Sequence, residues 1–196
     1  MSCRIDRLTG EAMRAAIPAL ARLRVTVFRD WPYLYDGTLA YESAYLRRFA
    51  ASEDAVVIAA YDGDEIVGAA TGAPLSDHAE DFAKAFAGDA FDIARVFYCG
   101  ESVLLPAYRG QGIGHAFFDG REAHARALGR FTHITFCGVV RPDDHPLRPP
   151  GYRPLDDFWM KHGYRKADGL TTTYAWKDID QVGETAKAMQ FWLKAL

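Results

Sequence analysis

The chain has 196 residues, of which 49% are hydrophobic and 25% are charged, and its net charge is -3. This length and composition predict one globular domain over residues 1–196, since such a chain buries about two-thirds of its unfolded surface. The slight negative charge argues against a nucleic-acid partner, and the lack of a long apolar run argues against a membrane partner. Three cysteines without CxxC spacing predict neither a disulfide framework nor zinc, which indicates a reduced, cytoplasmic compartment.

The first quarter of the chain predicts one strand and two helices. Residues 3–8 fit a short edge strand, and apolar residues recur at helical spacing over residues 11–29. Residues 31–37 form a loop rich in aromatic side chains, and residues 38–51 predict a second helix. Packing between the two helices is one explanation for these aromatic side chains.

The middle of the chain predicts the centre of a sheet. Residues 55–61 are almost continuously apolar, which is typical of a strand that is covered on both faces. A turn leads into a second strand over residues 65–73, and the two form a hairpin. A small helix is predicted over residues 76–88 as an insertion, and residues 93–105 are predicted to form a single strand.

A strand, a glycine-rich turn and the start of a helix are predicted over residues 100–114. Pro106 cannot donate to a sheet ladder, so the strand should end there, and helical spacing runs from Gly114 to about Gly129. The backbone N–H groups of the turn can converge on an anion at the positive end of the helix dipole. The glycine spacing fits neither a Rossmann dinucleotide loop nor a Walker phosphate loop.

The last third of the chain predicts three more strands and a short helix. Residues 131–140 are rich in β-branched residues and predict a strand parallel to the preceding one. Residues 141–155 hold five of the nine prolines, so we expect an irregular loop, followed by a short helix over residues 156–161. Residues 170–177 are strand-like, and the tail over residues 184–196 alternates with a period of two, which predicts a final antiparallel strand.

Two motifs resemble the GNAT N-acetyltransferase superfamily. The signature of its acyl-CoA pyrophosphate loop, Gln/Arg-x-x-Gly-x-Gly/Ala, is matched by Arg109, Gly112 and Gly114. Residues 158–164 resemble its second motif, an aromatic pair followed by glycine and another aromatic residue. The resemblance runs from the aromatic loop to the C-terminus. It implies an α/β fold with a central, mixed, twisted sheet of about six to seven strands and helices on both faces.

The same resemblance implies acetyl-CoA as the cosubstrate and no metal. The residues implied to hold its pyrophosphate are Arg109, Gly110, Gln111, Gly112, Ile113 and Gly114. Leu104 and Leu105 would offer backbone groups to the pantetheine arm and the thioester oxygen, and Trp159 would lie beside the thioester. The aromatic loop over residues 31–37 would border the acceptor site.

Acetyl transfer from a thioester needs a neutral amine and a proton donor for the departing thiolate. Glu101 stands in an apolar strand just before the loop and is the candidate base, although a charge held at a sheet edge for structural reasons would look the same. Tyr152 is the first candidate acid, with Tyr98 and His145 as alternatives. The family often has a tyrosine where Trp159 stands, and an indole cannot protonate a thiolate.

We therefore predict an acyltransferase that moves an acetyl group from acetyl-CoA to a primary amine of a small molecule, by direct attack in a ternary complex. A non-catalytic acyl-CoA-binding or sensing module stays open as an alternative, because Trp159 replaces the usual tyrosine. A protein or peptide N-acetyltransferase is the third hypothesis, and a closed acceptor site would argue against it. For the oligomeric state, a homodimer is also left open.

Overall fold

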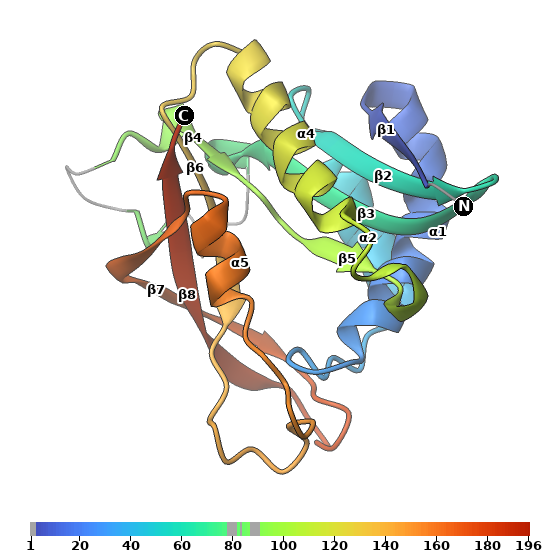
Figure 1. Ribbon diagram of the computed structural model, residues 1–196, viewed down its shortest axis with the longest axis vertical. Helices are drawn as coiled ribbons and strands as arrows, with labels where there is room; N and C mark the ends of the chain where they lie inside the picture. Colours follow the sequence, from blue (N-terminus) through green and yellow to red (C-terminus); the bar gives the residue numbers. More distant parts are fainter. Residues whose placement is uncertain (1–2, 78–81, 83, 87–90) are drawn as a thin grey trace.

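The computed structural model describes residues 3–77, 82, 84–86 and 91–196, so the helix expected over residues 76–88 lies largely outside the described residues. The chain forms an eight-stranded mixed sheet with helices on both faces (Figure 1). Its helices are α1 (Gly10–Phe28), α2 (Leu39–Phe49), α4 (Ile113–Ala127) and α5 (Asp156–Lys161). Its strands are β1 (Arg4–Leu8), β2 (Val56–Asp62), β3 (Glu65–Pro74), β4 (Val96–Tyr98), β5 (Ser102–Leu104), β6 (His133–Val139), β7 (Arg165–Trp176) and β8 (Thr185–Ala195).

The N-terminal strands β1, β2 and β3 are antiparallel neighbours, with β1 at the edge of the sheet as predicted. Side chains along β2 alternate between the two faces. Val57 and Ala59 pack with the apolar faces of α1 and α2, whereas Val56, Ile58 and Ala60 belong to the core that contains residues of α4. Burial on both faces explains why this strand is apolar throughout.

The C-terminal strands continue the sheet in the order β4, β6, β8 and β7. Strand β6 is parallel to β4, and β8 is antiparallel to both β6 and β7. The strands predicted over residues 131–140 and 184–196 are therefore confirmed. Phe191 and Trp192 are buried on β8, and they belong to different core clusters because successive side chains point to opposite faces.

The prediction of a single strand over residues 93–105 is wrong. Residues 93–95 form a 3-10 turn, and strands β4 and β5 are separated by three residues. Between Tyr98 and Ser102 the chain advances four residues, while the partner strand β3 advances three, from Ala73 to Ala70. One extra residue is thus accommodated as a β-bulge.

Thr71 of the neighbouring strand β3 holds this bulge in place. Its backbone N–H donates to the carbonyl oxygen of Glu101 at 3.0 Å, and its Oγ1 accepts the N–H of Glu101 at 3.3 Å. The N–H of Gly100 donates to the carbonyl of Thr71 at 3.2 Å. A Cβ on Gly100 would stand 2.6 Å from Oγ1 of Thr71, so the bulge requires glycine at this position.

Candidate active site

The bulge marks the point at which two neighbouring strands separate. Strand β4 pairs with β6, and the N–H of Cys99 still donates to the carbonyl of Thr135 at 2.8 Å. Beyond this point β5 pairs with β3, while β6 continues along β8 to Val139. The described residues form no ladder between β5 and β6, so backbone groups on their facing edges remain for a ligand.

The two leucines expected to offer backbone groups differ in what they offer. The N–H of Leu105 donates to the carbonyl of Val67 at 3.0 Å, so it is already used within the sheet. Because strand N–H groups alternate in direction, the N–H of Leu104 points away from β3, toward the separated edge. The carbonyl of Leu104 accepts a bond from Nε of Arg109 at 3.3 Å. Leu104 is therefore the better donor for a ligand along this edge.

The glycine-rich loop presents open backbone at the start of α4. Gly110 and Gly112 have φ values of 76° and 82°, in the left-handed region that glycine adopts without strain. Among the described residues, no atom would lie within 4 Å of a Cβ on either glycine, and no side chain caps the helix at Gly112. The first N–H groups of α4 and the positive end of its dipole therefore face open space, which suits a phosphate group.

The other loop residues have more local roles. A Cβ on Gly114 would stand 3.2 Å from Cζ of Phe158, so glycine here allows α5 to approach α4. Ile113 is buried in the core and anchors the first turn of the helix. Gln111 donates from Nε2 to the carbonyl of Ala107 at 3.1 Å and is exposed, leaving its backbone N–H at the loop surface.

Trp159 lies on the β6 side of the separated strands. Its ring packs against Phe136 and Trp192, with centroids 5.0 Å away in both cases. A Cβ on Gly138 would stand 3.2 Å from Cη2 of the indole, so the missing side chain lets Trp159 cover strand β6. The indole thus serves as an apolar wall beside strand β6.

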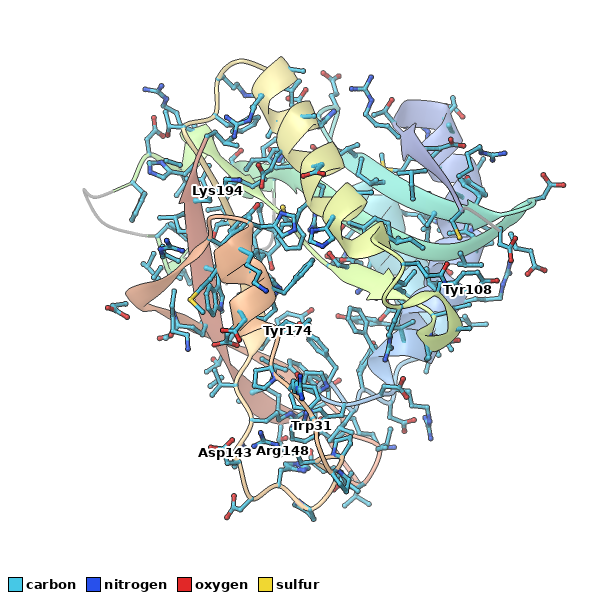
Figure 2. The ribbon with its side chains drawn as sticks, viewed as in Figure 1. Trp31, Tyr108, Asp143, Arg148, Tyr174 and Lys194 are labelled. Atoms are coloured by element: carbon cyan, nitrogen blue, oxygen red, sulfur yellow. The ribbon has the colours of Figure 1, made fainter. Side chains whose placement is uncertain are left out.

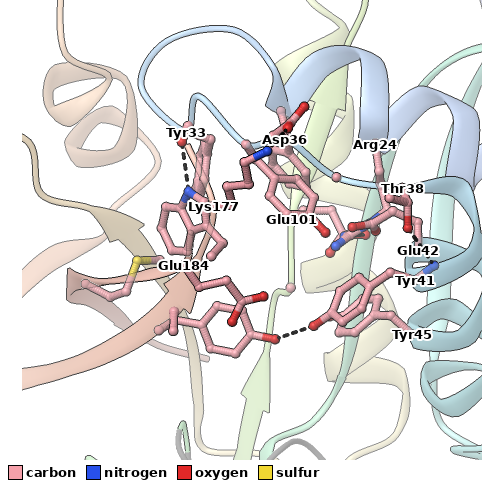
Figure 3. A pocket seen from close by; sticks show the side chains of 18 of the residues that line it. Arg24, Tyr33, Asp36, Thr38, Tyr41, Glu42, Tyr45, Glu101, Lys177 and Glu184 are labelled. Carbon is pink, nitrogen blue, oxygen red and sulfur yellow. Dashed lines mark hydrogen bonds and ion pairs between the residues drawn. The ribbon is translucent and has the colours of Figure 1, made fainter. Parts of the chain in front are cut away.

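A cavity of about 270 Å³ opens beside the bulge, between α1, α2 and the ends of β7 and β8 (Figure 3). Aromatic rings from six different segments make most of its wall. These rings belong to Phe28, Tyr33, Tyr35, Tyr41, Tyr45, Phe82, Tyr98, Tyr174 and Trp176. Two residues of the aromatic loop, Tyr33 and Tyr35, line the cavity as the resemblance implies, whereas Trp31 is not among its lining residues.

One arginine and two carboxylates form a buried cluster in this wall. Nη1 of Arg24 lies 2.5 Å from Oε1 of Glu101, and Nε of Arg24 donates to Oε2 of Glu42. The guanidinium carbon lies 4.5 Å from the ring centroid of Tyr45 and 5.0 Å from that of Phe28. Burial alone would lower the pKa of Arg24, but the carboxylates of Glu101 and Glu42 outweigh it and raise that pKa above its ordinary value.

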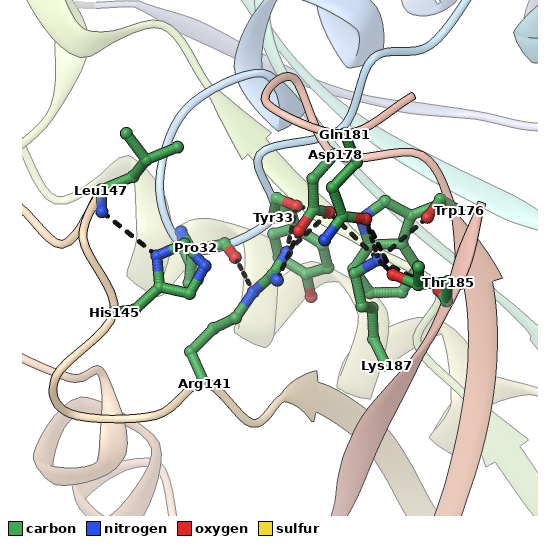
Figure 4. A network of polar contacts seen from close by, with 10 residues as sticks. All are labelled: Pro32, Tyr33, Arg141, His145, Leu147, Trp176, Asp178, Gln181, Thr185 and Lys187. Carbon is green, nitrogen blue, oxygen red and sulfur yellow. Dashed lines mark hydrogen bonds and ion pairs between the residues drawn. The ribbon is translucent and has the colours of Figure 1, made fainter. Parts of the chain in front are cut away.

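A second ionic network fixes the aromatic loop (Figure 4). Arg141, at the start of the proline-rich segment, donates to both oxygens of the buried Asp178 at 2.7 and 3.0 Å. It also donates to the carbonyls of Pro32 and Tyr33 at 2.7 and 2.6 Å. Nε1 of Trp176 donates to the same carbonyl of Tyr33 at 2.9 Å. These bonds hold Tyr33 against the cavity.

The three candidate acids occupy different places. Tyr98 is buried and lines the cavity, with its hydroxyl 3.3 Å from Sγ of Cys137. Tyr152 instead packs edge-on against Trp31, near Arg148, and is not among the cavity-lining residues. Figure 2 shows Trp31 and Arg148 beside the proline-rich segment that follows β6. His145 packs on the same tryptophan, and its Nδ1 accepts the N–H of Leu147. The structure therefore brings Glu101 together with Tyr98, and not with Tyr152.

Several cavity residues escaped the sequence analysis, and one of them left a signal. Arg24 occupies the apolar face of α1, four residues after Leu20 and four before Phe28. A charged residue on a face that otherwise packs inward needs a buried partner. The partners Glu42 and Glu101 come from other elements, so they could not be assigned to Arg24 from the sequence alone.

Two histidines connect the start of α4 to the end of α5. Nδ1 of His115 lies 2.8 Å from Nε2 of His162, a distance at which one ring donates and the other accepts. Burial, and then the neighbouring His115, lower the pKa of His162, and burial lowers the pKa of His124 on α4. Protonation of these rings is therefore easier in the unfolded chain.

Acidification should destabilise the fold through these histidines. Because their pKa values are lowered in the folded state, their contribution is fully present above the ordinary histidine pKa of about 6.5 and is lost as the pH falls below it. Melting temperatures measured between about pH 8 and 5 should fall on the acidic side. The decline should be shallower for His162→Asn, whereas His145→Asn should behave as the wild type. An identical decline in all three proteins would contradict this assignment.

Comparison with known proteins gives the family. The model of the acetyltransferase (GNAT) family matches residues 20–149, more than half of the chain. No significant match was found among curated protein sequences. Within the described residues no three metal-ligating side chains come together, and no helix is long and apolar enough to cross a membrane.

Solved structures share the fold over nearly the whole chain. A ribosomal-protein-alanine N-acetyltransferase from Brucella melitensis is 15% identical, with a TM-score of 0.63 over 98% of this chain and 99% of that one. A putative acetyltransferase from Acinetobacter baylyi is 11% identical, with a TM-score of 0.64 over 100% and 93%. A putative acetyltransferase from Salmonella typhimurium, solved with acetyl-CoA, is 12% identical, with a TM-score of 0.60 over 100% and 95%. The family match and the shared fold agree: the chain belongs to the GNAT acetyltransferase family, whose members transfer acyl groups from acetyl-CoA.

Proposed function

We propose that the chain is an N-acetyltransferase that moves an acetyl group from acetyl-CoA to the primary amine of a small molecule, by direct attack in a ternary complex. One observation carries this proposal: Glu101 lines the aromatic cavity and directly precedes β5. An amine in the cavity would therefore lie beside the strand edge that is free to hold the thioester arm. The aromatic cavity and the free edge of β5 thus meet at the carboxylate of Glu101.

The residues around the loop suit acetyl-CoA, which supplies an activated thioester when bound. Gly110 and Gly112 leave open space where a pyrophosphate would approach the backbone, and the uncapped start of α4 offers N–H groups to it. Leu104 offers its N–H to the arm along the edge of β5. Trp159 covers the opposite strand and keeps water from that side.

Proton transfer is assigned to residues of the cavity. Glu101 accepts the proton of the ammonium group, directly or through one water, because an ammonium has no lone pair for attack. Burial, and then the nearby Cys137 thiol, raise the pKa of Tyr98 well above its ordinary value, so its phenol stays protonated at neutral pH. Tyr98 can then donate a hydrogen bond to the departing sulfur, and we favour it over Tyr152 for this role.

The two alternatives find less support. Trp159 in place of the usual tyrosine favours a non-catalytic acyl-CoA-binding module. Such a module, however, has no need of a carboxylate such as that of Glu101 between the free edge of β5 and the aromatic cavity. The name of the Brucella protein suggests a protein acceptor. Here the hydroxyls of Tyr41 and Tyr174 meet at 3.0 Å across the cavity, which favours a small acceptor over a peptide.

The test is release of free CoA thiol from acetyl-CoA in the presence of a library of small primary amines, with mass spectrometry of the product. Amine-dependent release together with an acetylated amine is the expected result. Tight acetyl-CoA binding without amine-dependent release would favour the non-catalytic module. Release with peptides alone would favour a protein acetyltransferase.

A further inference from the structure

We infer that the acceptor is a small hydrophobic amine with one ammonium group and no carboxylate, of the arylalkylamine class. The inference rests on the proposed function and narrows it, since it excludes amino acids and peptides with a free carboxylate near the amine. It depends on three features of the cavity: its buried charge, its aromatic wall and the ion pairs at its rim.

The buried cluster carries more negative than positive charge. In the part of the chain that the structure describes, Arg24 is the one cation that pairs with the carboxylates of Glu42 and Glu101, whose side chains are 1% and 5% exposed. A cation bound in the cavity beside this cluster would balance the excess negative charge, which an uncharged or acidic group cannot do.

Arg24 is not available to bind a substrate carboxylate. Its Nε and Nη1 already pair with the two glutamates, and the ring centroids of Tyr45 and Phe28 lie 4.5 and 5.0 Å from the guanidinium carbon. A carboxylate placed beside this cluster would face two buried carboxylates. The cluster therefore attracts cations and repels anions.

The cations at the rim of the cavity are already paired with a carboxylate. Nζ of Lys177 pairs with Oδ2 of Asp36 at 2.8 Å, and Asp36 also accepts a bond from Arg29 (Figure 3). Glu184 adds another carboxylate to the lining. Among the described lining residues there are two cations and four anions. Since each cation is already paired with a carboxylate, no free positive group is left to receive a substrate carboxylate.

The aromatic wall suits a hydrophobic body attached to a cation. Rings around an ammonium group stabilise it through their negative faces, and the same rings bury an apolar substituent. The contact between the hydroxyls of Tyr41 and Tyr174 spans the cavity and limits the length of the substrate. A cavity of about 270 Å³ then holds a single aromatic ring with a short alkylamine more readily than a peptide.

A matched series of ligands tests this inference on the full chain. Calorimetry should compare 2-phenylethylamine, L-phenylalanine, which adds a carboxylate, and 2-phenylethanol, which lacks the charge. We expect phenylalanine to bind at least about 100-fold more weakly than the amine, and the alcohol about 10-fold more weakly. Thiol release from acetyl-CoA should follow the same order. Equal or tighter binding of phenylalanine would overturn the inference.

A pair of glutamate variants tests the cluster itself. Glu42→Gln should weaken 2-phenylethylamine binding about 10-fold. The difference in affinity between 2-phenylethylamine and phenylalanine should therefore become smaller, while acetyl-CoA affinity stays unchanged. Glu53→Gln changes an exposed glutamate outside the cavity and should bind all three ligands as the wild type does. If Glu42→Gln does not fold, the ligand series on the wild type still decides the question. Unchanged selectivity in a folded Glu42→Gln protein would contradict the role of the cluster.

Failure of this inference is distinguishable from failure of the proposed function. Thiol release with amino acids or peptides but not with 2-phenylethylamine would overturn the substrate class and leave the acetyltransferase intact. Selective binding of 2-phenylethylamine without thiol release from any amine would support the cavity chemistry and overturn the transfer reaction.

Discussion

Removing residues 187–196 should yield a chain that is insoluble or melts at a much lower temperature. Strand β8 lies between β6 and β7, and its ladder with β6 runs from Ala195 to Met189. Its loss would leave two strands without their shared partner and would uncover core residues packed on both faces. Solubility on expression and thermal melts followed by circular dichroism measure the effect.

Point variants separate core packing from simple loss of chain length. Phe191 is fully buried, so Phe191→Ala should lower the free energy of unfolding by about 3–5 kcal/mol. Val182 is fully exposed in the β7–β8 connection, and Val182→Ala should change that energy by no more than about 0.5 kcal/mol. A soluble truncated chain with an unaltered melting curve would show that β8 does not hold the sheet together.

Glu101→Gln should lower kcat by about 10² to 10⁴-fold while acetyl-CoA affinity stays nearly unchanged. The amide keeps the shape of the side chain but cannot take a proton from the acceptor. Steady-state kinetics with 2-phenylethylamine, or with the best amine from the library, give kcat and KM separately. Calorimetry with acetyl-CoA reports whether the cofactor site is intact.

Glu42→Gln is the matched control for this effect. It removes a carboxylate from the same arginine, so loss of pairing at Arg24 alone would affect both variants alike. We expect Glu42→Gln to act mainly on KM, and Glu101→Gln to act mainly on kcat. Near wild-type kcat in Glu101→Gln would mean that another group, such as a water held by backbone carbonyls, accepts the proton.

Local patterns in the sequence were enough to predict most of the helices and strands. The alternation of apolar and polar residues in the tail predicts a strand, and β8 confirms it. The continuous apolar run of β2 and the proline-rich segment after β6 are likewise explained by residues close together in the chain. Each of these patterns depends on neighbours a few positions away, which is why the sequence reveals them.

The bulge and the charge cluster depend on contacts that the sequence does not reveal. The break between β4 and β5 follows from Thr71 on another strand, thirty positions before Glu101. Arg24 meets Glu42 eighteen positions away, across two helices. The loop of Gly112 was recognisable because its glycines are adjacent, whereas the acceptor cavity is assembled from α1, α2, β4, β7 and their loops.

Titration of acetyl-CoA into the folded chain tests the central claim most directly. We expect micromolar-scale affinity for the wild type and no detectable binding for Gly112→Val, since a branched side chain would fill the space a pyrophosphate needs. Gly129→Val is the control: Gly129 also has a left-handed φ, of 70°, and open space around it, but it follows the other end of α4. Loss of binding in Gly112→Val with binding kept in Gly129→Val is the predicted result. Equal acetyl-CoA affinity in the wild type and a folded Gly112→Val protein would contradict the assignment of this loop.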